Sequence, residues 1–157
     1  MAQTIFGLDP GVTGAWAALK VDDGALVYAG DIPRFKRKIN GIELAYLFRH
    51  HKASHVVIEA VHSMPKQGVA SAFTFGEAFG TCLGVVNGMG LSYTLTTPQR
   101  WKGHFRLLGK DKDASREMAL SLFPGARDLL KRKKDHGRAD ALLIARHFLD
   151  LQRQGKT

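Results

Sequence analysis

Short apolar runs that end at turn-forming residues mark the beginning of this chain as a set of strands. Residues 4–8 are mostly apolar and strand-forming, and Pro10-Gly11 ends the segment abruptly just after Asp9. Residues 14–21 and 25–29 are two more strand-like segments, and an Asp-Asp-Gly turn separates them. The pattern predicts an antiparallel meander of three strands, with Asp9 at the carboxyl end of the first.

Beyond this meander the apolar pattern alternates between helix and strand. Residues 54–60 are a short apolar strand that carries Glu59 near its end. Because helices flank this strand, we expect it to pair parallel with the first strand in the interior of the sheet. Residues 91–96 form a fifth strand. Helical spacing predicts helices at residues 41–52, 70–89, 98–101, 113–123 and 138–151, and residues 31–40 and 62–69 are predicted loops.

This order of elements predicts an α/β fold with a five-stranded mixed sheet flanked by helices. Its sequence of meander, helix, strand, helix, strand and C-terminal helices matches a ribonuclease H-like fold. At 157 residues and 17.3 kDa, the chain suits a single domain over residues 1–157. A shared fold does not define an activity, so the function has to be argued from a site.

The charge balance points to a polyanionic partner. Lys and Arg number 23 against 14 Asp and Glu, which gives a formal charge of +9. Basic residues are concentrated at 34–38, 100–112 and 127–138. A single run of this kind is common in solvated loops, but three together favour a nucleic acid.

Cysteine use and the apolar pattern bear on the compartment. Cys82 is the single cysteine, which excludes an intramolecular disulfide and a thiolate zinc site, and its helical setting predicts a small buried apolar side chain. The N-terminus shows no leader pattern, and no run of about 18 apolar residues is apparent. We therefore expect a cytoplasmic protein with no membrane partner.

Three acids in apolar settings are the candidate catalytic residues. Asp9 and Glu59 end predicted strands, and Asp140 lies among apolar residues of the last helix, one turn after His136. Asp9 alone could simply open a turn, but three carboxylates with an imidazole form an oxygen-rich cluster that suits Mg²⁺ or Mn²⁺ better than zinc. Two such ions about 4 Å apart can promote in-line phosphodiester hydrolysis. Asp135 either caps the last helix or joins the ligands.

Three segments together resemble the RuvC family of Holliday junction resolvases. They are Gly7-Leu8-Asp9-Pro10-Gly11, Val57-Ile58-Glu59 and Ala139-Asp140-Ala141-Leu142, and their order and spacing match across most of the chain. The C-terminal motif Asp-His-Gly-Arg-Ala-Asp-Ala-Leu is similar to phage or prophage members, which implies a bacterial or phage-infected cell.

The resemblance implies that Asp9, Glu59 and Asp140 are metal ligands. Family members carry an Asp or His three residues before the last Asp, whereas Gly137 stands there in this chain. The fourth ligand therefore falls on His136 or Asp135. The resemblance also implies a homodimer that binds a four-way junction and nicks two opposing strands.

The long helix and the basic loop supply the candidate contacts with DNA and with a second subunit. Gly76, Gly80, Gly84 and Gly88 recur every four residues, either to pack on the sheet or to contact a helix across a dimer. By the resemblance, an aromatic side chain among Phe73 and Phe75 reaches the junction centre, although both could be core residues. Phosphate contacts are implied for Lys102, Lys110 and Lys112. Lys112 also precedes a helix N-terminus that could receive a phosphate.

Three other functions remain open. The segment Gly7 to Gly14 is also similar to the phosphate loop of actin-like sugar kinases, which need two such domains and so a longer chain. A non-catalytic DNA-binding relative would keep the fold but has no need of the three carboxylates. A broader nuclease acting on forks or flaps is an alternative that the sequence does not exclude.

Overall fold

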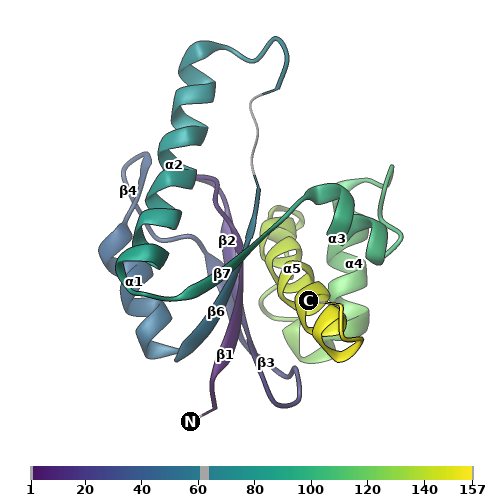
Figure 1. Ribbon diagram of the computed structural model, residues 1–157. Coiled ribbons are helices and arrows are strands. Elements are labelled where there is room, and N and C mark those ends of the chain that lie inside the picture. Colours follow the sequence, from purple (N-terminus) through teal and green to yellow (C-terminus); the bar gives the residue numbers. More distant parts are fainter. Residues whose placement is uncertain (1, 61–63, 157) are drawn as a thin grey trace.

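A five-stranded mixed sheet forms the centre of the molecule. The computed structural model describes residues 2–60 and 64–156. Within that part of the chain the strand order is β3-β2-β1-β6-β7, with β2 antiparallel to β1 and β3, and β6 parallel to β1 and β7 (Figure 1). The strands span β1 Thr4–Asp9, β2 Ala15–Lys20, β3 Leu26–Asp31, β6 Ala53–Glu59 and β7 Ser92–Thr96. The predicted α/β fold, the meander and the parallel pairing of the fourth strand in the interior are confirmed.

Helices cover both faces of the sheet. α1 (Gly41–His50) and α2 (Val69–Gly88) lie on one side, and α3 (Pro98–His104), α4 (Lys112–Leu122) and α5 (His136–Arg153) lie on the other (Figure 1). Alternate residues of β1 explain the two layers, since strand side chains point to opposite faces. Ile5 belongs to the core beneath α5, whereas Phe6 and Leu8 belong to the core beneath α1 and α2. Two short 3₁₀ helices, Pro124–Ala126 and Lys133–Asp135, connect α4 to α5.

Residues 31–40 are not the simple loop that the sequence predicts. β4 (Arg34–Phe35) and β5 (Lys38–Ile39) form a small antiparallel hairpin. The amide of Asn40 donates to the carbonyl of Pro33 over 2.9 Å and closes its base. The predicted loop at residues 62–69 lies partly outside the described residues, and its described part ends where α2 begins at Val69.

The glycines of α2 do not pack on the sheet. Ala78, Cys82 and Val86 face the core, which confirms the buried setting of Cys82. Among the described residues, a Cβ added to Gly76, Gly80, Gly84 or Gly88 would meet no atom within 4 Å. Of the two roles that the sequence left open for these glycines, packing against the sheet is therefore wrong. The helix contact across a dimer stays a prediction.

α2 also corrects the expectation that no long apolar segment exists. The helix has the length and the apolar composition of a membrane span, although just 17% of its most apolar stretch is buried. The core helix of a soluble protein can have the same length and apolar composition, but such a helix is mostly buried, whereas α2 is not. This helix therefore presents an apolar surface that its own chain leaves uncovered.

Candidate active site

Asp9 and Glu59 lie side by side because they end neighbouring parallel strands. The register pairs Leu8 with Ile58, so the next position on each strand brings the two acids level. Alternation along the strands turns both toward the face that α5 covers, as Ile5 and Val57 show. Both carboxylates are half-buried.

α5 brings Asp140 to the same place through close contact with β1. Gly7 lies two residues before Asp9, and a Cβ there would overlap the backbone carbonyl of Ala141. The absence of a side chain at Gly7 therefore lets α5 rest directly on β1. Asp140 precedes Ala141, so this contact holds its half-buried carboxylate over the strand ends. α5 begins at His136, so His136 and Asp140 are one helical turn apart on the same face.

Electrostatics confirm that the three acids are neighbours. Burial raises the pKa of Asp140 to about 7, the Ser115 hydroxyl partly opposes this shift, and the charges of Glu59 and Asp9 raise it further. The pKa of Glu59 is also raised, chiefly by burial and in addition by the charge of Asp9. Three carboxylates that resist ionisation together form a site that a cation would stabilise.

Asp9 is the third member of this group, and the charge of His136 affects its pKa. Burial is the main cause that raises the pKa of Asp9. The amide of Gly11 donates to its Oδ1 over 3.2 Å and lowers the pKa, and the charge of His136 lowers it as well. The His136 imidazole, at the start of α5, therefore lies within electrostatic range of Asp9.

Trp101 and Lys102 complete the surroundings of Glu59. The Trp101 ring is fully buried, and its Nε1 donates a 2.6 Å hydrogen bond to Oε2 of Glu59. The Lys102 ammonium lies 5.4 Å from the centroid of the Trp101 ring, and its charge lowers the pKa of Glu59 and of Asp140. The predicted phosphate-binding Lys102 therefore stands beside the acids rather than on a remote loop.

Asp135 is engaged elsewhere. Its carboxylate is buried and accepts hydrogen bonds from the side chain of Arg132, the shortest of them 2.7 Å, and from the Arg132 amide over 2.9 Å. The Arg132 bonds hold the pKa of Asp135 below its usual range, although burial works against them. No side-chain bond from Asp135 caps α5 itself. This engagement favours His136 as the fourth residue of the site.

The donor set fits a hard divalent cation. Three carboxylates and an imidazole supply oxygen and nitrogen ligands that suit Mg²⁺ or Mn²⁺. Thr96 pairs with Glu59 on the neighbouring strand, and its buried hydroxyl has no partner among the described residues. In that part of the chain, however, no three acid, His or Cys side chains are converged on one point as the ligands of a bound ion are. The carboxylates of Asp9, Glu59 and Asp140 would have to rotate toward one another to share an ion.

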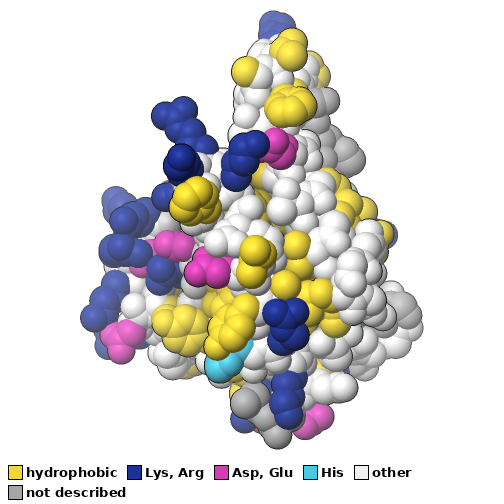
Figure 2. Space-filling model, turned by 90° about the vertical axis from the view of Figure 1, so that its left-hand side faces the viewer, with side chains coloured by type: hydrophobic (Ala, Val, Ile, Leu, Met, Phe, Trp, Pro, Cys, Tyr) yellow, Lys and Arg dark blue, Asp and Glu magenta, His cyan; other side chains and the backbone are white. Residues whose placement is uncertain are grey.

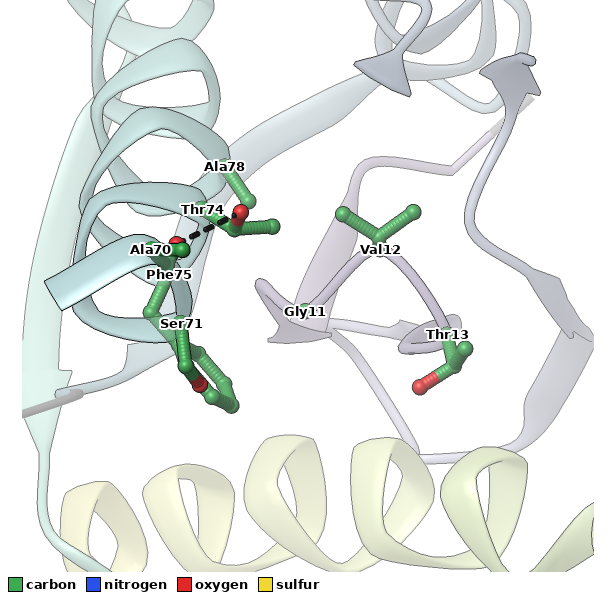
Figure 3. Close-up of a pocket in the computed structure, with 8 residues that line it drawn as sticks. All are labelled: Gly11, Val12, Thr13, Ala70, Ser71, Thr74, Phe75 and Ala78. Carbon is green, nitrogen blue, oxygen red and sulfur yellow. Dashed lines mark hydrogen bonds between the residues drawn. The ribbon is translucent and has the colours of Figure 1, made fainter. Parts of the chain in front are cut away.

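A cleft opens beside the turn that follows Asp9. It has a volume of about 370 Å³ and lies between the turn after β1 and the first half of α2, above α5 (Figure 3). Gly11, Val12 and Thr13 form one wall, and Phe75 lies against the other. Phe75 is 44% exposed and Phe73 is 70% exposed, so the alternative that both are core residues is wrong. Phe75 faces the cleft, whereas Phe73 does not line it.

Lys110 and Lys112 lie just before and at the start of α4, the helix that carries Ser115 beside Asp140. Both are exposed, Lys110 beside a surface hollow near α4 and Lys112 at the first position of that helix. The carboxylate of Asp111 already accepts from the amide of Ala114 over 3.1 Å at this N-terminus. A phosphate at the amides of α4 would meet that negative charge, which speaks against the helix-end site expected there.

Sequence reasoning missed three supporting contacts. It did not place Trp101 against Glu59, although a buried indole N–H needs an acceptor and so signals a polar neighbour. It missed Ser115 beside Asp140, for which no local signal exists because the two residues lie on different helices. The sequence indicated the contact between Arg132 and Asp135 only weakly, because the two residues are oppositely charged and three positions apart.

Comparisons with known proteins agree with the resemblance in the sequence. No protein-family model matches the chain. It is 45% identical over 89 residues to the chloroplastic Holliday junction resolvase MOC1 of Chlamydomonas reinhardtii, a match that covers 56% of this chain and 10% of that protein. The chain thus spans about a tenth of the length of the curated relative that it matches.

Solved structures share the fold over nearly the whole chain. RuvC of Thermus thermophilus in complex with a Holliday junction substrate superposes with a TM-score of 0.68 at 19% identity, covering 98% of this chain and 97% of that one. The yeast mitochondrial Holliday junction resolvase Ydc2 gives 0.65 at 12% identity, covering 98% and 82%. Fowlpox virus resolvase with junction DNA gives 0.58 at 14%, covering 93% and 98%. The chain therefore has the ribonuclease H-like fold of RuvC and shares part of its sequence with a Holliday junction resolvase.

Proposed function

We propose that this protein is a metal-dependent endonuclease that resolves four-way DNA junctions by paired phosphodiester nicks. The observation that carries the proposal is the placement of Asp9, Glu59 and Asp140 on one face of the sheet, where burial raises the pKa of each. The fold of RuvC and the sequence shared with the chloroplastic resolvase support a junction as the substrate.

Asp9, Glu59, Asp140 and His136 would hold the metal, one or two Mg²⁺ or Mn²⁺ ions. Bound there, such ions supply Lewis acidity for in-line attack of water on a phosphodiester. An imidazole beside the carboxylates makes Mn²⁺ more acceptable than in an all-oxygen site. The products are expected to be 5′-phosphate and 3′-hydroxyl ends, which leave ligatable nicks.

The surrounding residues orient the ligands. The Gly11 amide engages one oxygen of Asp9, and Trp101 engages one oxygen of Glu59. In each case the second oxygen stays available to a cation, and the bond limits the rotation of the carboxylate. Such restraint places ligands before substrate arrives and so reduces the reorganisation that the reaction needs.

The DNA contacts extend outward from this centre. Lys102, beside the acids, would contact the phosphate next to the scissile bond, and Phe75 would hold an unstacked base in the cleft beside Asp9. Phe73, Lys110 and Lys112 are exposed and would contact DNA further from the cut.

A homodimer accounts for the paired nicks. A four-way junction has twofold character, and a twofold dimer carries two sites. α2 presents the small residues Gly76, Gly80, Gly84 and Gly88 on a surface that its own chain leaves uncovered. Close approach of two helices along this surface would bury it.

The proposal is tested by incubating the protein with labelled four-way junction, flap, fork and duplex DNA in Mg²⁺, Mn²⁺ or chelator. Symmetrical, metal-dependent nicks confined to the junction support a resolvase. Cutting of flaps and forks as well would replace it with a broader branched-DNA nuclease. Junction binding without any cutting in either metal would indicate a non-catalytic relative and overturn the proposal.

A further inference from the structure

The β4–β5 hairpin presents basic side chains away from the body of the protein. Phe35 pairs with Lys38 across the hairpin, so Lys36 and Arg37 alone form the turn at its tip. The tip residues are exposed, and the Phe35 ring is 68% exposed with the Lys36 ammonium 5.6 Å from its centroid. An exposed aromatic ring among cations is a combination that suits nucleic acid.

The tip carries a lysine in a backbone conformation that glycine and asparagine adopt more easily. Lys36 has φ of +57°, a left-handed conformation that Gly and Asn adopt far more readily. For other residues it costs on the order of 1 kcal/mol. The hairpin thus carries a charged side chain at its most prominent position at a cost in stability.

A surface hollow lies between the base of the hairpin and the segment that leads into α5. It has a volume of about 230 Å³, and Arg34, Arg132 and Lys134 share its lining with the carboxylates of Asp31 and Asp135. Thr13 and Gly14 line it as well, and they follow closely after Asp9. His136 begins α5 two residues after Lys134. We name this series of cations, which runs from the hairpin tip to the edge of the active site, the basic track: Arg34, Lys36, Arg37, Arg132 and Lys134.

Most of the charge on the basic track is available to a partner. Arg132 is paired with Asp135, and the nearby Asp31 is paired with Arg138 over 2.8 Å. Within residues 2–60 and 64–156, no ion pair joins the other four cations of the track to a carboxylate. Figure 2 shows Lys and Arg side chains gathered along one side of the face that carries α1, α2 and the hairpin.

We propose that the basic track binds the phosphate backbone of one duplex arm as it leaves the active site, with Phe35 against the sugars. The proposal rests on the proposed binding of branched DNA and adds the path that an arm takes. The fit is one of charge, because the five cations of the track, four of them without an ion pair among the described residues, match the spaced phosphates of a duplex. Three cations of the track line the same hollow as the turn after Asp9. A duplex arm bound along the track would therefore be continuous with the strand that is cut.

The test uses the double variant Lys36→Asn/Arg37→Gln of the full chain. Asn is compatible with the left-handed conformation at position 36, so the hairpin keeps its turn while losing its charge. Junction affinity is measured in chelator over a fourfold range of salt. Loss of two phosphate contacts lowers the log–log slope by about 1.8, so the variant loses about tenfold less affinity than the wild type over that range.

Lys20→Gln is the matched control. Lys20 is exposed and pairs with Thr4 at the opposite end of β1 from Asp9, so its variant should keep the wild-type slope. Junctions with progressively shortened arms give a second measurement, in which the wild type should lose affinity more steeply than the double variant. An unchanged slope, or equal dependence on arm length, overturns the basic track. If the wild type itself neither binds nor cuts junctions, the proposed function has failed instead.

Discussion

Neutralising Asp140 should stabilise the metal-free protein. Burial and the neighbouring acids raise the pKa of this carboxyl to about 7 from an ordinary 3.8. The folded protein therefore holds the Asp140 proton more tightly than the unfolded chain does. The stability that this provides is fully present below about pH 4 and is lost as the pH rises through about 7. Above that pH the wild type has an ionised carboxylate in an unfavourable site, whereas Asp140→Asn does not.

The expected magnitude follows from the same shift. A difference of about three pKa units at about 1.36 kcal/mol each gives roughly 4 kcal/mol as an upper bound. Water and the Lys102 ammonium ease the cost, so a gain of about 1–3 kcal/mol in the free energy of unfolding is expected near pH 8. Because the loss in the wild type is gradual between the two pKa values, less than half of the gain should remain near pH 5.

Urea unfolding of wild type and Asp140→Asn in chelator measures this difference at the two pH values. Asp128→Asn is the control, because the Asp128 side chain is 87% exposed and its loss should change little at either pH. Addition of Mn²⁺ should reverse the order, since an ion that binds only the folded wild type adds stability by mass action. If Asp140→Asn is no more stable than the wild type near pH 8, burial and the neighbouring acids do not raise the pKa of Asp140 as described.

Three further changes test other parts of the structure. Gly7→Ala should cost several kcal/mol in urea unfolding, because its Cβ overlaps the Ala141 carbonyl and separates α5 from β1; stability close to the wild type would refute that packing. Trp101→Phe removes the donor to Glu59, so single-turnover cleavage should slow about tenfold while junction affinity is kept, and equal rates would show that the bond does not position Glu59. Gly84→Leu should leave the chain folded, because a Cβ there meets no described residue within 4 Å. Sedimentation should show a monomer where the wild type is expected to be a dimer, and an intact dimer would place its interface elsewhere.

The sequence predicted the centre of the fold and the three acids of the site. Turn signals after Asp9 and apolar runs of strand length were enough, because strand ends and helix faces follow from local periodicity. Asp9 and Glu59 had to meet once their strands were parallel neighbours, and the register confirms it. The roles of these residues as metal ligands stay a prediction.

Features that depend on contacts between distant segments were not predictable. The β4–β5 hairpin has strands of two residues each, and its turn carries Lys36 where a Gly or Asn would have signalled it. The exposed glycine face of α2 had the same sequence pattern as a packed one. The sequence predicted that Asp135 either caps the last helix or binds the metal. In the structure its carboxylate instead accepts a hydrogen bond from the Arg132 side chain.

The most direct test of the metal-dependent nuclease is the comparison of wild type and Asp9→Asn on a labelled four-way junction. Binding is measured in chelator, and single-turnover cleavage is measured in Mg²⁺ and in Mn²⁺. Asp9→Asn removes charge at the carboxylate cluster and leaves the basic surface unchanged. Junction affinity should therefore be kept while paired nicking disappears in both metals. Cleavage by Asp9→Asn at a rate near that of the wild type would contradict the assignment of the site.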